Sequence, residues 1–294
     1  VQTCALPISS RAAGNARRAA GFFPADQDPS LTPLLDGAAG SEGRGGDLYA
    51  MSTELIRQDD VTIRFAGDSG DGMQLTGTQF TETTAKVGND LATFPDFPSE
   101  IRAPAGTRAG VSGYQIHFSS SDIYTPGDAP DVLVAMNPAA LIINYKDIKP
   151  GGIILVNTGS FGERDLARAE CETNPLTDGT LTGFRVIEED IHQRTIEALE
   201  GTTLGKKDVL RCKNFYTLGM MYWLFHRPIE QTLEWLEEKF KNKPDLVEAN
   251  SKALKAGFNH GELLRLFQGR YEVPKVDNVP KGTYRNIMGN QALA

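Results

Sequence analysis

One short stretch, VTIRFAGDSGDGMQLTG, constrains the fold of this chain more than any other. It starts with alternating apolar residues, which are typical of a β-strand, at Val61, Ile63 and Phe65. A glycine-rich turn over residues 67–72 follows, and apolar residues then recur at the spacing of one helix face, at Met73, Phe80 and Val87. The sequence therefore predicts a strand, a tight turn and a helix that stops at Gly88.

The glycine turn combines two properties that favour different ligands. A turn of this kind before a helix is typical of phosphate sites, because the helix N-terminus offers unpaired N–H groups and positive potential. Asp68 and Asp71 oppose a phosphate, and Ser69 stands where the dinucleotide fingerprint has its second glycine. We therefore expect no tight NAD binding. The turn is either purely structural, or its amides face a ligand or a partner domain while Asp71 caps the helix.

A β-branched side chain tolerates positive φ badly. We expect Gly70 to adopt positive φ, so that Gly70→Val would damage the turn.

The rest of the chain predicts an α/β fold. Apolar runs and alternating apolar residues predict strands near residues 114–118, 131–137, 152–157 and 184–188. Helices are expected over residues 138–148 and 190–199, and a C-terminal helical extension over residues 208–225, from 228 to 240 and over 244–267. Strands that alternate with helices indicate a mostly parallel sheet with helices on both faces.

Residues 89–110 show no period and include FPDFP, so we expect a long ordered loop, which in compact domains is usually functional. Glu100 and Arg102 lie in this loop, as either a substrate or interface pair or a local ion pair. Asn137 and Asn157 follow buried strands, where ligands of open α/β sheets gather, although either can simply form a turn.

Charge and composition exclude several classes of function. A net charge of −8, from 30 basic and 38 acidic residues, argues against nucleic acid as the main partner. The longest apolar run, residues 215–225, is too short for a membrane span. The 3 cysteines have no CxxC spacing, which fits a reducing cytoplasm and excludes an iron–sulfur cluster held by this chain alone. The 4 histidines lie far apart without metal-ligand spacing, so we expect no metal site and assign no catalytic residue.

The two ends of the chain differ from its middle in composition. We expect residues 1–50 to be disordered or non-native. Val1 to Ser9 can be back-translated into a common sequencing adapter, and Met51 is a plausible initiator methionine. Residues 51–270 are expected to form the folded domain. Residues 271–294 are rich in proline and charge, which predicts a linker that ends in the first turn of another helix.

Taken together, the segments FAGDSGDGMQLTG, SEIRAPAGT, DVLVAMNPAAL and KNFYTLGMMYWLF resemble one family. They are similar to the α subunit of 2-oxoacid:ferredoxin oxidoreductases, in particular the 2-oxoglutarate type. The resemblance covers roughly Val61 to Ala294 and concerns the γ-type domain that precedes a thiamine-facing domain. It implies a Rossmann-like domain that packs over the active site and helps to admit coenzyme A.

The residues singled out above are expected to have roles at the edge that the resemblance places against the thiamine-facing domain. The expected cofactor contacts are Gly67, Ser69, Gly70, Gly72 and Asn137. The expected contacts to substrate or to the domain interface are Glu100, Arg102 and Asn157. In the full complex, Arg102→Ala is expected to lower kcat/KM at least about tenfold.

The family reaction is the oxidative decarboxylation of a 2-oxoacid with coenzyme A, which gives an acyl-CoA, carbon dioxide and reduced ferredoxin. The resemblance implies that thiamine diphosphate, Mg²⁺ and a 4Fe–4S cluster are held largely by a β subunit, and that ferredoxin is the redox partner. We therefore expect this chain to bind no cofactor by itself and to be inactive alone. The thiamine-facing domain should begin near GNQALA, where the sequence stops.

Three alternatives stay open at the level of sequence. Pyruvate, branched-chain and indolepyruvate relatives share the fold, so the 2-oxoacid is set by resemblance only. The domain could instead be a non-catalytic Rossmann-like module for assembly or gating. A free-standing nucleotide-binding protein is the third alternative.

Overall fold

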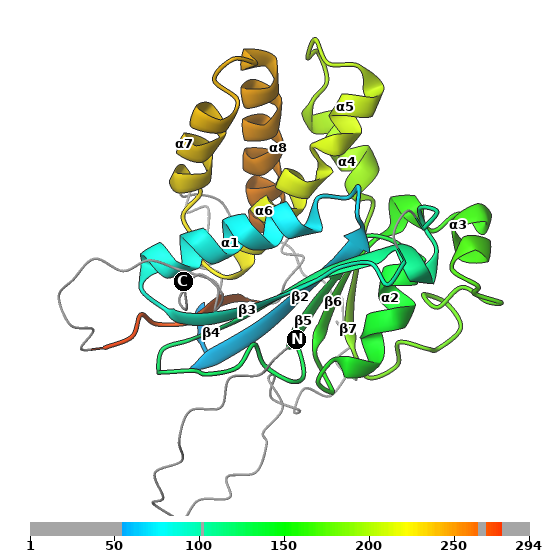
Figure 1. The fold of residues 1–294 in the computed structure, drawn as a ribbon, viewed down its shortest axis with the longest axis horizontal. Coiled ribbons are helices and arrows are strands. Elements are labelled where there is room, and N and C mark those ends of the chain that lie inside the picture. The colour runs from blue at the N-terminus through cyan, green and yellow to red at the C-terminus, as the bar shows by residue number, and fades with distance from the viewer. Residues whose placement is uncertain (1–54, 101–102, 264–268, 278–294) are drawn as a thin grey trace, which may run out of the picture.

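The computed structural model describes residues 55–100, 103–263 and 269–277 (Figure 1). A 6-stranded sheet in the order β3-β4-β2-β5-β6-β7 forms the centre, and a 2-stranded sheet joins β1 to β8. The strands are β1 (Leu55–Arg57), β2 (Asp60–Asp68), β3 (Asp90–Asp96), β4 (Val111–Ser119), β5 (Val132–Ala135), β6 (Ile153–Asn157), β7 (Arg185–Glu189) and β8 (Arg270–Glu272).

Helices follow most strands of the large sheet, and several more helices follow its last strand. They are α1 (Met73–Val87), α2 (Pro138–Asn144), α3 (Glu163–Arg168), α4 (Ile191–Ala198), α5 (Lys206–Arg211), α6 (Lys213–Leu224), α7 (Glu230–Lys239) and α8 (Pro244–Leu263). Short 3-10 turns occur at Arg108–Gly110, Tyr145–Asp147 and Thr158–Ser160.

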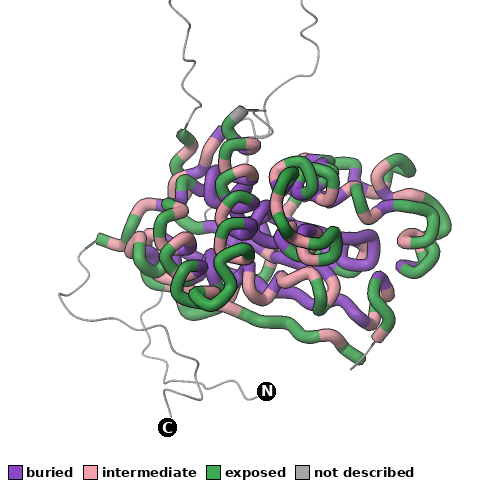
Figure 2. Tube along the Cα trace, turned by 90° about the horizontal axis from the view of Figure 1, so that it is seen from above, coloured by how far each residue is buried: buried purple, intermediate pink, exposed green. Residues whose placement is uncertain are grey.

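The large sheet is covered on both faces, which confirms the predicted fold class. Strands β2, β5, β6 and β7 run parallel, and β4 runs antiparallel to both β2 and β3. Along β5, Val132 and Val134 face the core formed with α1, α4 and α6, whereas Leu133 and Ala135 face the core formed with α2 and α3. Figure 2 shows the buried chain at the centre, with exposed helices around it.

The expected loop over residues 89–110 is only partly a loop, because its first part forms strand β3. This prediction was wrong for residues 90–96, since Pro95 argued against a strand. Strand β3 lies at the edge of the sheet and pairs with β4 alone, so one side of its backbone needs no partner. An edge position is where a strand tolerates proline.

Two helix predictions needed correction. The expected single helix over residues 208–225 is divided into α5 and α6 at Cys212. Cys212 has ψ −4°, far from the helical value of about −42°. The expected linker from residue 271 begins with β8, where Tyr271 is fully buried and joins the main core. A hydrogen bond from Val276 N to Gly88 O extends this packing further.

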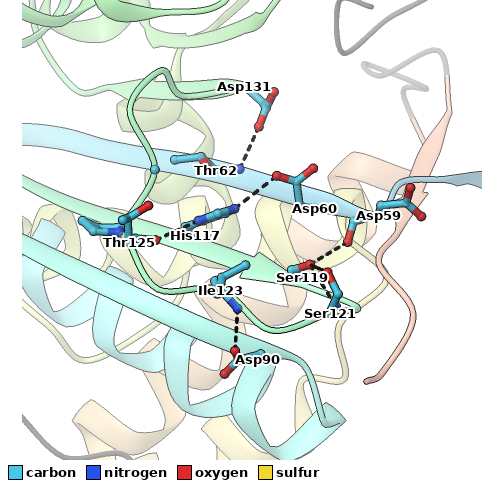
Figure 3. Close-up of polar contacts among 12 residues, drawn as sticks. Asp59, Asp60, Thr62, Asp90, His117, Ser119, Ser121, Ile123, Thr125 and Asp131 are labelled. Carbon is cyan, nitrogen blue, oxygen red and sulfur yellow. Dashed lines mark hydrogen bonds and ion pairs between the residues drawn. The ribbon is translucent and has the colours of Figure 1, made fainter. Parts of the chain in front are cut away.

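The amino-terminal end of β2 is anchored by contacts with β4 and with the loop between β4 and β5 (Figure 3). Asp131 Oδ2 accepts a hydrogen bond from Thr62 N at 2.8 Å, and the Asp131 carboxylate also forms an ion pair with Lys149. His117 Nε2 lies 3.1 Å from Asp60 Oδ2, and His117 Nδ1 lies 2.8 Å from Thr125 O. These contacts fix the loop between β4 and β5 against the sheet.

The His117–Asp60 pair predicts a pH-dependent contribution to stability. The hydrogen bond to Asp60 raises the pKa of His117 above its usual value, although burial opposes this. A raised folded-state pKa gives stability that is fully present below about pH 6.5 and is lost as the pH rises through the folded pKa. His117→Gln should therefore reduce the free energy of unfolding by up to about 1 kcal/mol at pH 6 and by less at pH 9. Urea unfolding of both proteins at the two pH values measures this, and a difference independent of pH would contradict it.

Candidate functional site

The candidate site lies where the helix connections change sides of the sheet. Strand β2 leads to α1 on one face, whereas its neighbour β5 leads to α2 on the opposite face (Figure 1). In open α/β sheets such a change leaves a crevice beyond the carboxyl ends of the strands. Asp68 ends β2, Asn137 follows β5 and Asn157 ends β6, so these side chains share one edge of the sheet.

Glycine is required at two positions of the turn. A Cβ atom at Gly67 would lie 3.0 Å from Met136 Cβ and 2.8 Å from the Asp71 carboxylate. Gly72 has φ 75°, and a Cβ atom there would lie 2.6 Å from Asn214 Nδ2. Both glycines therefore permit close approach of neighbouring elements.

Ser69 and Gly70 are exposed, and nothing lies within 4 Å of the position that a Cβ atom would take at Gly70. Gly70 is not among the residues with positive φ, so the expected left-handed conformation is found at Gly72 instead. The reason is that the chain must reverse at the last residue before α1, where Gly72 is the N-cap.

A pair of alanine substitutions separates these two glycines. Gly72→Ala should lower the free energy of unfolding by about 1–3 kcal/mol, because it adds a left-handed non-glycine residue and a clash with Asn214. Gly70→Ala is the matched control and should change stability by less than about 0.5 kcal/mol. Thermal or urea unfolding of the 294-residue chain tests both, and equal effects would contradict the assignment.

Asp71 holds the turn by a different means from the N-cap role that its sequence position predicted. Its Oδ2 accepts a hydrogen bond from Asp68 N at 2.9 Å, and its Oδ1 lies 2.8 Å from Lys213 Nζ. Helix α1 has no side-chain cap. The ion pair explains the correction, because Lys213 at the start of α6 holds the carboxylate between the two helices.

The Asp68 side chain connects the turn to the β3–β4 loop. Its Oδ2 accepts a hydrogen bond from Gly106 N at 2.9 Å, which closes the β3–β4 loop over the turn. Burial raises the pKa of Asp68, and nearby Asp71 raises it further, whereas Gly106 N and the Asn137 amide lower it.

The two asparagines each make structural hydrogen bonds through one side-chain atom. Asn137 Oδ1 caps α2 by accepting a hydrogen bond from Ala140 N at 2.8 Å. Asn157 Nδ2 donates to Met136 O and to Ser160 Oγ, which ties the ends of β5 and β6 together. Asn157 Oδ1 is buried without a partner among the described residues. The Asn137 amide is already engaged by the Asp68 carboxylate, whose pKa it lowers. The edge therefore offers Asn157 Oδ1 as an acceptor for a polar group.

Lys213 extends the site toward α4. Its Nζ lies 3.1 Å from His192 Nε2, and His192 Nδ1 lies 3.1 Å from Gly159 O. Burial lowers the pKa of His192, and the charge of Lys213 lowers it further. His192 is therefore neutral at pH 7, with Nδ1 donating to the carbonyl and Nε2 accepting from Lys213.

The sequence analysis assigned no role to Lys213 or to His192. No local sequence pattern could have identified them, because Lys213 pairs with Asp71 and His192 bonds to Gly159, and both partners lie in other elements.

Of the two loop residues predicted to contact substrate or an interface, the structure describes Glu100 but not Arg102. Glu100 is exposed, and its backbone N–H bonds to Ala109 O at 3.3 Å. Arg102 lies outside the described residues, so its pairing with Glu100 and its expected role are not tested. The expectation for residues 1–50 also lies outside the described residues.

Within residues 55–100, 103–263 and 269–277, no group of three His, Cys, Asp or Glu residues could hold a metal ion. The described cysteines are Cys171 and Cys212, and burial raises the pKa of Cys212 to about 11. These residues do not fit an iron–sulfur cluster. No helix in the described ranges is long and apolar enough to cross a membrane.

Comparison with known proteins gives a consistent family. Residues 62–260 match the family described as pyruvate ferredoxin/flavodoxin oxidoreductase. The chain is 48% identical over 256 residues, 87% of its length, to 2-oxoglutarate oxidoreductase subunit KorA of Mycobacterium tuberculosis, and it spans 39% of that subunit. It is 28% identical over 113 residues to ketoisovalerate oxidoreductase subunit VorA of Methanothermobacter marburgensis, covering 37% of this chain and 22% of that one.

One solved structure is also similar. It is a 2-oxoglutarate:ferredoxin oxidoreductase from Magnetococcus marinus with 2-oxoglutarate, coenzyme A and succinyl-CoA bound, with a TM-score of 0.57 and 25% identity. The match covers 74% of this chain and 34% of that one.

Proposed function

The chain belongs to the pyruvate ferredoxin/flavodoxin oxidoreductase family, and from that premise we propose that it is part of the α subunit of a 2-oxoglutarate:ferredoxin oxidoreductase. The proposed reaction converts 2-oxoglutarate, coenzyme A and oxidised ferredoxin into succinyl-CoA, carbon dioxide and reduced ferredoxin. The 48% identity to the KorA subunit over 87% of the chain carries the proposal.

We propose that this chain contributes an assembly and coenzyme A-admitting domain, with residues 51–270 as its γ-type domain. The edge described above supports this role, because it carries exposed Ser69 and Gly70 beside the N-terminus of α1. Asn157 adds a buried amide oxygen that no described residue bonds. Asp68 and Asp71 make the turn a poor phosphate cradle, so the edge is better suited to the neutral, amide-containing arm of coenzyme A or to a neighbouring domain.

The chemistry of electron transfer is proposed to reside on other parts of the complex. Bound thiamine diphosphate would supply the electron sink for decarboxylation. The described residues of this chain do not fit an iron–sulfur cluster or a metal ion. Their proposed role is to orient coenzyme A, the acyl acceptor, and to exclude water at the edge of the sheet. Glu100 and Arg102 are proposed to meet an anionic group of the substrate, of coenzyme A or of the facing domain.

Assembly with a β subunit tests the proposal. The 294-residue chain alone should give no turnover with 2-oxoglutarate, coenzyme A and a viologen dye. A complete α subunit that contains this domain, co-purified with its β subunit, should reduce the dye only when coenzyme A and a 2-oxoacid are both present. Turnover by the chain alone, or a complex inactive with every 2-oxoacid, would contradict the proposal.

A second substrate has a specific observation in its favour. The partial match to ketoisovalerate oxidoreductase subunits makes a branched-chain 2-oxoacid the alternative. The same assay decides between them when 2-oxoglutarate, pyruvate, 2-ketoisovalerate and indolepyruvate are compared by kcat/KM. A preference for 2-ketoisovalerate would retain the family assignment and replace the substrate.

A further inference from the structure

The Arg227 side chain is a buried cation with two nitrogens that no described residue bonds, and it lies beside Phe118 on β4, at the end of the sheet opposite Asn137. It follows α6 and has only 3% of its surface exposed. Its guanidinium carbon lies 5.0 Å from the centre of the Phe118 ring. Nε and Nη2 are both buried and have no hydrogen-bond partner within the described structure.

The surroundings of Arg227 do not compensate for this burial. Burial lowers the pKa of Arg227 to about 10, so the group is still charged at neutral pH. Glu272 is near enough to oppose the shift, yet its carboxylate pairs with Arg57 Nε at 3.7 Å. The carboxyl ends of α1 and α6 favour a cation through their dipoles, but they place no acceptor on Nε or Nη2. A buried charge that keeps unmade hydrogen bonds is costly.

A cavity adjoins this side chain. It has a volume of about 420 Å³ and is lined on its apolar side by Val87, Phe225, Val273 and Pro274. Small-molecule sites typically range from about 300 to 1,000 Å³ and combine apolar walls with a few polar groups. The cavity therefore has room for a molecule larger than an inorganic ion.

The charged residues around the cavity favour an anion. Its basic lining residues are Arg57, Arg227 and Lys275, and its acidic ones are Glu272 and Asp277. His226 also lines it and adopts φ 52°, a conformation rare for a residue with a side chain. Burial lowers the pKa of His226, so it offers a neutral ring there. Unusual backbone conformations of this kind are concentrated at binding sites.

We propose that this cavity binds a small oxyanion, a phosphate or carboxylate group carried by a molecule with an apolar portion, and that the positive charge of Arg227 at its wall holds the anion together with Arg57 and Lys275. An arginine next to a partly desolvated anion attracts it strongly, because few water molecules screen the two charges. The apolar walls then cover the rest of the ligand. The site is separate from the carboxyl edge proposed to meet coenzyme A.

The test uses the full chain and two probes, inorganic phosphate and succinate, at constant ionic strength with chloride as the reference. Calorimetry should detect binding of at least one probe to the wild-type chain, and the stronger probe identifies the anion class. Arg227→Met should weaken that binding at least tenfold. Arg211→Met is the matched control, because Arg211 is an exposed arginine paired with Asp208, and it should leave binding unchanged.

A second variant distinguishes a ligand from an internal partner. Glu272→Gln should tighten binding several-fold, because it removes a carboxylate that competes for the cationic groups of the cavity. If Glu272 were instead the partner of Arg227, this variant would lower the melting temperature without affecting the probes, and the proposal would be wrong.

Folding of the variants is followed in chloride alone. Arg227→Met should melt there at the same or a higher temperature than the wild type, since it removes an uncompensated charge. A large fall in its melting temperature would indicate an internal partner and overturn the proposal. Failure of both probes to bind, or equal binding by wild type and Arg227→Met as for an adventitious ion only, would also overturn it.

Discussion

Gly257→Val should destabilise the chain by more than about 3 kcal/mol, because two helices of the C-terminal bundle touch through their backbones. Glycines on α6 and α8 meet at this crossing. A Cβ atom at Gly257 would collide with the Tyr216 carbonyl group and would lie 2.8 Å from its carbon. A Cβ atom at Gly219 would lie 2.7 Å from Phe258 N and collide with Leu254 O. Backbone atoms cannot rotate away, so the helices must separate.

The measurement is the urea midpoint of the full chain, with Gly257→Ala as a graded variant and Gly205→Ala as the matched control. Nothing lies within 4 Å of the Cβ position at Gly205, so alanine there should be neutral. An unchanged midpoint for Gly257→Ala would mean that α6 and α8 are farther apart than this packing requires. We expect the effect to be on folding, since both contacts are between helix backbones.

Asp71→Asn should destabilise the chain by about 2–4 kcal/mol, because it removes the counter-charge of a largely buried lysine. The side chains of Lys213 and Asp71 are 14% and 13% exposed, and their ionic atoms lie 2.8 Å apart. Asparagine can still accept the hydrogen bond from Asp68 N, so the substitution isolates the charge. The partial exposure of both groups keeps the expected cost below that of a fully buried pair.

A double-mutant cycle checks this prediction. Lys213→Met in the Asp71→Asn background should recover part of the lost stability, because the unpaired cation is gone. Asp208→Asn is the control, since Asp208 and Arg211 form an exposed pair whose side chains are 47% and 65% accessible. Removing that pair should change the free energy of unfolding by less than about 0.5 kcal/mol. Equal losses at Asp71 and Asp208 would show that burial of the Lys213 pair has no energetic consequence.

Several elements could be predicted because their signals are local. The alternation at Val61, Ile63 and Phe65 and the stop at Gly88 correspond to β2 and to the end of α1. The runs near residues 132 and 153 correspond to buried parallel strands. Side-chain period and glycine conformation are properties of a few neighbouring residues, so they can be read without knowing the rest of the chain.

Other elements depended on partners that are distant in sequence. Strand β3 contains Pro95 and exists because β4 offers it an edge, and β8 exists because β1 lies beside it. At the candidate site, the positions of Gly67, Asn137 and Asn157 on one edge followed from the predicted strands. The partners of Asp71 did not, because Lys213 begins a helix far along the chain.

The sequence by itself determined the strand, turn and helix that open the fold, the mostly parallel character of the sheet and the resemblance that leads to the family. These depend on periodicity, on glycine and on short segments in a given order. Only the tertiary structure decided that Gly72 rather than Gly70 needs a left-handed backbone, that Asp71 pairs with Lys213, and that Arg227 is buried beside a cavity. Burial, charge pairing and close approach are relations between distant segments, and they arise only when the chain has packed.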